Sequence, residues 1–448
     1  MKIILVSFAA LLLHSVSAQS FDKEKIDRYF DRLAEKNKAM GNLVLAKQGT
    51  VIYSRCIGYS QISPEGKEPL IPANKFRMGS VTKTFTATII MQLVEEGKLK
   101  LTDKLAKFFP QVPNAEKITI EQILSHRSGI PEISNKENAE KNFRTSYMSK
   151  EDHLALIVQT PPDFEPGSKA QYSNSGYFVL GLVIEKITGK DYSKVLEKNI
   201  AQKIGLKDTY LATGNIDVTK QESLTYFKVP GGDWRSVPET HPSLLFSAGG
   251  LISTPYDMAR FMDALFNGKL ISKQSLEKML SMKDGEGFGM VIFDFAGKTF
   301  YGHTGGADNY GAWMAYQPEE KLALAYTTNA KVYPVKDIVE GVMDIYYNQP
   351  FEIPTFESVA VSAELLDQYA GEYSVAGAPA RFKILRKGDT LYAQPASEKN
   401  PVPLQATAQD TFKLDNGSPA GIVFVFDTGK KQMTIKVNGG ERILVKQE

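Results

Sequence analysis

The sequence of 448 residues has little cysteine, little histidine and almost no net charge, and each shortage narrows its function. A single cysteine, Cys56, cannot form an intramolecular disulfide. The formal charge of +2, from 53 basic and 51 acidic residues, argues against nucleic-acid or membrane-surface binding driven by charge. The five histidines are scattered without the spacing of metal ligands, so we predict neither a metal site nor a cofactor.

Long hydrophobic runs are also missing, apart from one at the N-terminus. There, Lys2 precedes an apolar run from Ile3 to Leu13, and Val16-Ser17-Ala18 follows it. A basic start, a short apolar core and a small-x-small site are typical of a secretory signal peptide. The run is too short for a permanent membrane span. We therefore predict a signal peptide over residues 1–18, cleavage after Ala18, and a secreted or periplasmic protein without stable membrane insertion.

The pattern of the mature chain indicates one large domain over residues 19–346. Strand-like runs flank Gln48-Gly49-Thr50, which is typical of a hairpin, and strand patterns return between Phe288 and Asn329. Helical, mostly apolar stretches separate these two groups in the sequence. We expect both groups to form one antiparallel sheet, which predicts an α/β (α+β) sandwich of a sheet flanked by helices, with a helical insertion.

A change in the residue pattern near residue 347 indicates a second domain. Residues 347–361 contain two prolines and little periodicity, as expected of a linker. Residues 362–448 then show several short alternating runs separated by Gly, Asp and Asn. Short strands at near-regular spacing predict a small all-β domain, a barrel or a sandwich.

Three Ser-x-x-Lys tetrapeptides occur, and their surroundings distinguish them. Ser20–Lys23 lies at the mature N-terminus, and Ser275–Lys278 lies in a charged helix start. Only Ser80–Lys83 opens a helix that is mostly apolar and hence buried. Burial of a lysine amine is costly and depresses its pKa, which is what a base beside a serine nucleophile requires. The alternative is that Ser80 is a helix cap and Lys83 a solvated flank.

A second short motif, Tyr172-Ser173-Asn174, immediately precedes an apolar helix that ends near Gly189. A tyrosine hydroxyl can relay a proton to a leaving group, and an amide can bind a substrate carbonyl. A similar triplet, Tyr346-Tyr347-Asn348, falls at the linker, where a positioned site is not expected.

A third motif, His303-Thr304-Gly305-Gly306, lies between a predicted strand that ends at Tyr301 and another that starts near Gly311. Glycines at a strand edge let a substrate backbone approach closely, and a free backbone N–H there can complete an oxyanion hole. The alternative is an ordinary glycine turn between two strands.

In this order, the three motifs resemble those of the serine β-lactamase and penicillin-binding-protein superfamily. The Tyr-x-Asn form resembles the branch of class C β-lactamases, D,D-peptidases, D-aminopeptidases and esterases. The resemblance covers roughly residues 25 to 345 and includes the phrases 76–80, 124–131 and 247–251.

This resemblance implies a role for each motif residue. Ser80 would be the acylated nucleophile, Lys83 its base and Tyr172 a proton shuttle, with the order of Lys83 and Tyr172 left open. Asn174, His303, Thr304 and Gly305 would bind substrate, and the N–H groups of Ser80 and Gly306 would form the oxyanion hole. The segment with His126 and Ser128 would be a packed, structural loop.

His303 stands where β-lactamases usually have a lysine, and histidine is mostly neutral near pH 7. The sequence therefore favours a serine hydrolase of amides or esters, similar to D,D-peptidases, D-aminopeptidases or esterases, with a small-molecule or peptide substrate. One alternative is a class C-type β-lactamase. Another is a catalytically silent penicillin- or peptidoglycan-binding protein. The C-terminal domain would shield the cleft, mediate an oligomer or simply stabilise the fold.

Overall fold

The protein is described from a computed structural model. The residues described are 21–133, 144–229, 233–375, 382–396, 401–414, 422–437 and 440–447. The predicted signal peptide, residues 1–18, and the first Ser-x-x-Lys serine, Ser20, lie outside these ranges.

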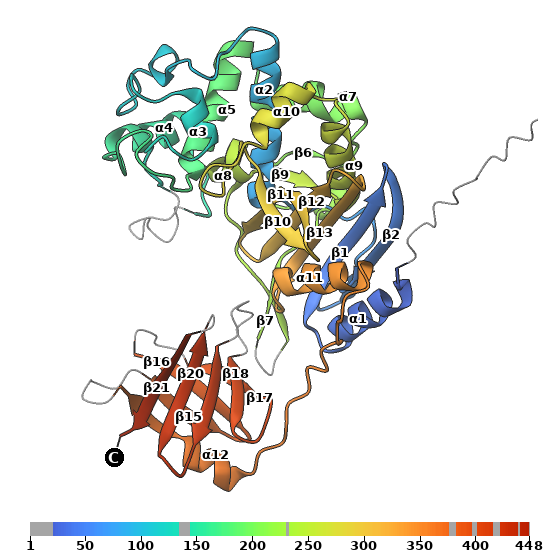
Figure 1. Ribbon diagram of the computed structural model, residues 1–448, viewed down its shortest axis with the longest axis vertical. Helices are drawn as coiled ribbons and strands as arrows, with labels where there is room; N and C mark the ends of the chain where they lie inside the picture. Colours follow the sequence, from blue (N-terminus) through green and yellow to red (C-terminus); the bar gives the residue numbers. More distant parts are fainter. Residues whose placement is uncertain are drawn as a thin grey trace, which may run out of the picture.

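A six-stranded antiparallel sheet forms the centre of the larger body (Figure 1). The early hairpin and the late strands join through the pairing of β1 with β13, for example Leu43 opposite Tyr326. The predicted antiparallel sheet with flanking helices is therefore confirmed. In order across the sheet, the strands are β10 (Val291–Phe295), β11 (Lys298–Ala307), β12 (Tyr310–Gln317), β13 (Leu322–Lys331), β1 (Ala39–Lys47) and β2 (Thr50–Ile57).

Two helices cover one face of this sheet, α1 (Lys23–Glu35) and α11 (Val335–Tyr346). The apolar residues of α1 recur at a spacing of three or four, so they form one buried stripe. That stripe packs with α11 and with alternate residues of β1 and β13, such as Leu45 and Leu324, in one hydrophobic cluster.

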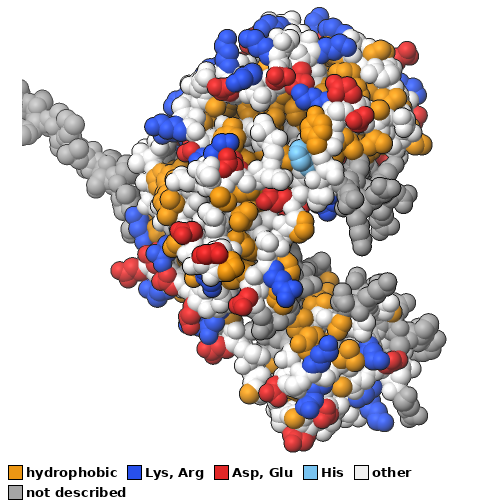
Figure 2. All heavy atoms as spheres, turned by 180° about the vertical axis from the view of Figure 1, so that it is seen from behind, with side chains coloured by type: hydrophobic (Ala, Val, Ile, Leu, Met, Phe, Trp, Pro, Cys, Tyr) orange, Lys and Arg blue, Asp and Glu red, His pale blue; other side chains and the backbone are white. Residues whose placement is uncertain are grey.

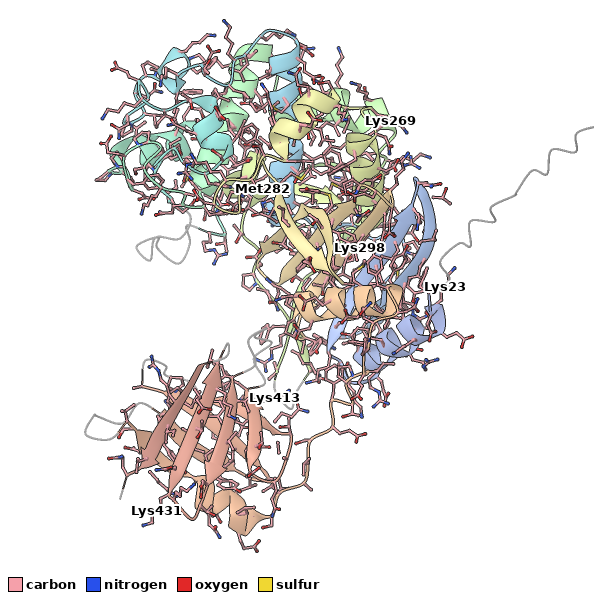
Figure 3. All side chains as sticks on the ribbon, in the orientation of Figure 1. Lys23, Lys269, Met282, Lys298, Lys413 and Lys431 are labelled. Atoms are coloured by element: carbon pink, nitrogen blue, oxygen red, sulfur yellow. The ribbon has the colours of Figure 1, made fainter. Side chains whose placement is uncertain are left out.

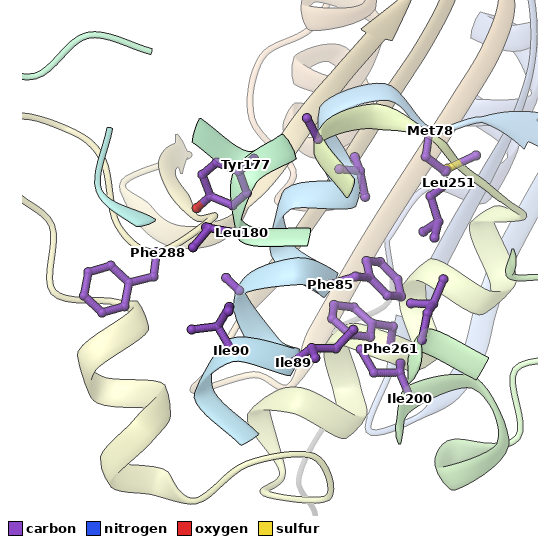
Figure 4. Close-up of a cluster of buried hydrophobic side chains, with 14 of the residues drawn as sticks. Met78, Phe85, Ile89, Ile90, Tyr177, Leu180, Ile200, Leu251, Phe261 and Phe288 are labelled. Carbon is purple, nitrogen blue, oxygen red and sulfur yellow. The ribbon is translucent and has the colours of Figure 1, made fainter. Parts of the chain in front are cut away.

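The opposite face carries the helices that hold the site. At their centre is α2 (Thr82–Glu95), in which every residue from Thr82 to Leu93 is buried. Figure 4 shows Phe85, Ile89 and Ile90 of α2 within a second buried hydrophobic cluster, in which Phe85 stacks on Phe261 with ring centroids 3.7 Å apart. The longer helices around α2 are α5 (Asn174–Thr188), α8 (Pro242–Gly249) and α9 (Pro255–Phe266).

Shorter elements complete this body. Its other helices include α3 (Ile120–Leu124), α4 (Lys150–Gln159), α6 (Tyr192–Leu196), α7 (Gln202–Ile204) and α10 (Lys273–Met279). The small sheets are β3 (Tyr59–Ser63) with β4 (Gly66–Pro69), β5 (Phe76–Arg77) and β6 (Tyr210–Leu211) with β9 (Leu251–Ser253), and β7 (Tyr226–Lys228) with β8 (Trp234–Ser236).

The C-terminal domain is a closed eight-stranded barrel preceded by α12 (Ala363–Tyr369), which confirms the predicted barrel (Figure 1). Residues 347–362 contain no helix or strand and join the two parts. The Val359 N–H donates to the Ala406 carbonyl at 2.9 Å and ties this segment to the barrel. The barrel strands are β14 (Gly371–Ser374), β15 (Phe382–Lys387), β16 (Thr390–Pro395), β17 (Val402–Ala406), β18 (Thr411–Leu414), β19 (Val423–Asp427), β20 (Gln432–Val437) and β21 (Gly440–Lys446).

Surface charge is mixed rather than segregated. Basic and acidic side chains are interspersed over the face in Figure 2, in keeping with the net charge of +2. Among the described helices, none is both long and apolar enough to cross a bilayer.

The strand boundary predicted at the third motif is wrong. His303-Thr304-Gly305-Gly306 lies inside β11, not in the turn that follows it. The chain turns later, near Asp308, which has a positive φ of 50°. The alternative of a glycine turn is therefore excluded, and the two adjacent glycines instead allow close packing of the strand against its neighbours.

Candidate active site

A short 3₁₀ turn, Gly79–Val81, carries Ser80 directly into the first turn of α2. Gly79 has a φ of +52°, and a Cβ at this position would lie only 2.6 Å from the backbone nitrogen of Gly306. A glycine is therefore required here, both for its conformation and for the close approach of the turn to β11. This packing holds Ser80 beside the glycine end of the third motif.

The Lys83 side chain is completely buried and points at Ser80. Its Nζ lies 3.1 Å from Ser80 Oγ, 2.7 Å from Asn174 Oδ1 and 2.8 Å from the Ala248 carbonyl oxygen. Burial lowers the pKa of Lys83 from 10.5 to about 7, although the carboxylates of Glu132 and Glu286 act in the opposite direction. The amine thus titrates near neutral pH while it touches the serine.

The hydroxyl of Tyr172 donates to Ser80 Oγ at 2.7 Å, so tyrosine and lysine both reach the serine. Its ring stacks on His126 with centroids 4.4 Å apart, and the ring centroid lies 4.7 Å from Lys83 Nζ. The residue is 38 % exposed, yet burial by the surrounding residues raises the pKa of Tyr172. Tyr172 is therefore protonated at neutral pH.

The start of α5 fixes the second motif in place. Ser173 caps this helix by accepting from the Gly176 N–H at 3.0 Å. The Ser173 N–H donates to Nδ1 of His126 at 3.0 Å, and the Asn174 N–H donates to the Glu132 carboxylate. Carboxylates are favoured at helix N-termini, where the N–H groups have no partner within the helix. This arrangement aims Asn174 Oδ1 at Lys83.

In the third motif, the closest contact with the serine turn is made by Gly305. A Cβ on Gly305 would lie 1.9 Å from the carbonyl oxygen of Met78, so no larger residue fits without movement of backbone. The pairing of β10 with β11 ends at Gly302, so on that side the backbone of residues 303–307 has no strand partner in the described part of the chain.

His303 is buried and uncharged at neutral pH. Burial and the charge of Lys83 lower its pKa to about 4. Its Nδ1 is hydrogen-bonded to the Thr304 carbonyl oxygen, and Nε2 has no hydrogen-bond partner among the residues described. Its ring centroid lies 6.3 Å from that of Tyr172.

The predicted site residues thus meet at one place, to different degrees. Lys83 and Tyr172 contact Ser80 directly, and Asn174 does so through Lys83. Ser80, Asn174 and Gly306 also line a cavity of about 370 Å³. His303 lies beside Tyr172 but is not part of the cavity wall, and neither are Thr304 and Gly305.

The other copies of the motifs lie elsewhere, although Ser275 and the Tyr346-Tyr347 pair are buried rather than solvated. Ser275 and Lys278 lie on α10, where the Ser275 hydroxyl is engaged with Ser272. Tyr346 and Tyr347 pack in the hydrophobic cluster on the opposite face of the sheet, and Asn348 follows the end of α11.

Comparison with known proteins identifies the family of this chain. The model of the Beta-lactamase family matches residues 26–341. This chain belongs to the Beta-lactamase family. Penicillin-binding protein 4* of Bacillus subtilis (strain 168) is 25% identical over 410 residues, which cover 84% of this chain and 88% of that protein.

Two solved structures are similar along most of their length. The octameric penicillin-binding protein homologue from Pyrococcus abyssi has a TM-score of 0.67 and 25% identity, and covers 94% of this chain and 100% of its own. The D-stereospecific amidohydrolase from Streptomyces sp. has a TM-score of 0.59 and 26% identity, and covers 68% of this chain and 94% of its own. Membership of this family supports a hydrolase of the serine β-lactamase and penicillin-binding-protein superfamily.

Several residues that act on Lys83 lie outside the three motifs and were not predicted from the sequence. The Ala248 carbonyl lies after Phe246, whose φ of +35° breaks α8. Only the similarity of segment 247–251 to the superfamily pointed to Ala248 in the sequence. Glu132 and Glu286, which act on Lys83, come from loops distant in the sequence.

Proposed function

We propose that this protein is an exported serine hydrolase that cleaves amide or ester substrates through an acyl-enzyme at Ser80. One observation carries the proposal: the buried amine of Lys83 touches Ser80 Oγ and two fixed acceptors, Asn174 Oδ1 and the Ala248 carbonyl oxygen. An ammonium has three N–H donors, and each has an acceptor here.

The same geometry suits the neutral amine. When Lys83 loses one proton, two N–H groups remain for the two fixed acceptors, and the lone pair is left facing Ser80 Oγ. The serine hydroxyl can then donate its proton to Nζ, which makes Lys83 the general base. A pKa of about 7 keeps much of Lys83 in this form at neutral pH.

The remaining steps follow from the neighbouring groups. Ser80 Oγ attacks the substrate carbonyl carbon, and the backbone N–H groups of Ser80 and Gly306 stabilise the oxyanion. Tyr172, whose hydroxyl already contacts Oγ, passes a proton to the leaving amine or alcohol. Water then attacks the acyl-enzyme, which releases the acid product and restores the serine.

A peptide or amide substrate is favoured over a β-lactam. His303 is uncharged at neutral pH, so it does not supply the cation expected at this position of a β-lactamase. The similarity to a D-stereospecific amidohydrolase agrees with hydrolysis of D-amino-acid amides or peptides. A silent binding protein has no use for a buried lysine amine in contact with a serine hydroxyl, because burial of such a group costs folding free energy that binding does not require.

Two further features belong to the proposal. Residues 1–18 support export, and the octameric homologue, which also covers most of this chain, supports an oligomer in which the C-terminal barrel takes part. The mass of the full chain in solution, measured by light scattering, tests the second point; a monomer contradicts it.

Activity can be tested with a small panel of substrates. We expect the mature protein to hydrolyse D-alanyl peptides or p-nitrophenyl esters, and to turn over the β-lactam nitrocefin much more slowly. Lys83→Met should abolish hydrolysis of all of them. Fast nitrocefin turnover would indicate the β-lactamase alternative, and no hydrolysis of any substrate would indicate the silent binder.

A further inference from the structure

The cavity beside Ser80 includes a region of charged side chains. Besides Ser80, Asn174 and Gly306, its wall contains Arg144, Asp308 and Lys331. None of these three charged residues belongs to a motif of the proposed mechanism. A substrate that acylates Ser80 would extend into this region.

Lys331 reaches the site by an unusual route. It is the last residue of β13, but its side chain lies over the neighbouring strands. Gly306 of β11 and Gly311 of β12 are cross-strand partners. A Cβ on Gly311 would lie 3.4 Å from Lys331 Cδ, and a Cβ on Gly306 would lie 3.7 Å from Lys331 Nζ. The lysine therefore lies across a pair of glycines, and its ammonium ends next to Gly306.

The ammonium of Lys331 makes no hydrogen bond or ion pair with any residue in the described ranges. Asp308 acts on it electrostatically, yet that carboxylate is already occupied. It accepts from the Thr240 N–H at 2.9 Å and the Thr240 hydroxyl at 2.7 Å, and pairs with Arg144 at 3.5 Å. One positive charge therefore remains without a partner in the cavity.

Such a charge is costly to leave half-buried. Burial lowers the pKa of Lys331, which shows that the amine is partly removed from water. An anionic group in the cavity would restore the lost interactions, since a charge-assisted hydrogen bond is stronger than a neutral one. Lys331 lines the cavity, whereas His303, which stands where β-lactamases usually have a lysine, does not.

We propose that Lys331 is a substrate-binding residue that holds a carboxylate of the substrate beside the predicted oxyanion hole. The inference rests on the proposed function and deepens it. The preferred substrates become amides or peptides with a free carboxylate close to the scissile bond, and neutral esters and amino-acid amides become poorer substrates. Leu244 and Leu245, on the same cavity wall, would contact the apolar part of such a substrate.

A matched pair of substrates tests the proposal: N-acetyl-D-alanyl-D-alanine and the same peptide with a C-terminal amide. We expect wild-type kcat/KM to favour the acid about 10- to 100-fold. Lys331→Met should lower this ratio towards one, and Lys331→Arg should keep most of it. Lys269→Met is the control, since Lys269 is exposed on the outer surface, apart from the cavity (Figure 3), and should leave the ratio unchanged.

Measuring peptide binding to an inactive variant tests the role of Lys331 independently of catalysis. In a Ser80→Ala background, calorimetry should show tighter binding of the acid than of the amide, and Lys331→Met should remove the difference. Equal binding of the two peptides, or a preference for the acid that survives Lys331→Met, overturns the role of Lys331 even if Ser80 is acylated. Failure of a fluorophosphonate to label Ser80 counts against the proposed function alone.

Discussion

Lys83 Nζ and Ser80 Oγ lie 3.1 Å apart where a 3₁₀ turn leads into α2, a helix that is buried from Thr82 to Leu93. Burial both lowers the pKa of the amine and fixes its neighbours, so the environment that destabilises the charged lysine also makes it a base. The catalytic proposal depends on this one contact, and the predictions below test its parts.

The rate should depend on pH through Lys83. Because the neutral amine is the active form and its pKa is about 7, kcat/KM should fall about tenfold per pH unit below that value. The acidic limb of the pH profile is the range in which kcat/KM falls with pH. Glu286 raises the pKa of Lys83, so Glu286→Gln should move this limb to lower pH and increase the rate at pH 6. A pH profile of kcat/KM for both proteins is the measurement, and an upward shift of the limb contradicts the account.

Asn174→Asp should act in the opposite direction. The substitution places a negative charge where Asn174 Oδ1 now lies, 2.7 Å from Lys83 Nζ. An adjacent carboxylate stabilises the ammonium, so the limb should move up by about 1–3 pH units. The rate at pH 7 should fall and recover in part at pH 9, whereas a pH-independent loss would indicate that Asn174 does not act through Lys83.

Tyr172→Phe removes the hydroxyl that donates to Ser80 Oγ at 2.7 Å but keeps the ring that stacks on His126. We expect kcat/KM to fall about 10²- to 10⁴-fold, within the range of general acid–base catalysis, with little change in melting temperature. Rates measured by stopped-flow acylation identify the step. A loss below threefold would mean that Tyr172 only packs against the site.

Gly305→Ala tests the close packing of β11 against the serine turn. The new methyl would lie 1.9 Å from the Met78 carbonyl oxygen, so the strand or the turn must move. We expect a loss of about 1–3 kcal/mol in unfolding free energy, measured by urea denaturation, and a large loss of activity.

Gly66→Ala provides the matched control for this prediction. A Cβ on Gly66 meets no atom within 4 Å, so this variant should match the wild type in both measurements. Equal stability and activity of Gly305→Ala and Gly66→Ala would show that the third motif does not depend on this contact.

Local patterns in the sequence predicted much of the fold. The spacing of Ile26, Tyr29, Phe30 and Leu33 gave the buried stripe of α1. Gln48 and Gly49, both with positive φ, form the predicted turn between β1 and β2. The all-β C-terminal domain, a barrel or a sandwich, was predicted from the regular recurrence of short strands. The contact of Lys83 with Ser80 was predicted from one tetrapeptide in an apolar context.

Contacts between residues that are far apart in the sequence could not be predicted in the same way. Nothing near Lys331 suggests a site, because its position depends on two glycines of other strands that become partners only in the folded sheet. The Glu132 contact with the start of α5 likewise joins residues 42 apart. The predicted strand end before His303 was wrong for the same reason, since Gly305 packs against Met78, a residue distant in the sequence.

The most direct test is the covalent state of Ser80. Mature protein incubated with a fluorophosphonate or a labelled penicillin, digested and analysed by mass spectrometry, should carry the adduct on the peptide with Ser80 and on no other serine. Labelling should fall at least tenfold in Lys83→Met, which lacks the base. An unmodified Ser80, or substrate turnover that is undiminished in Ser80→Ala, would contradict the account.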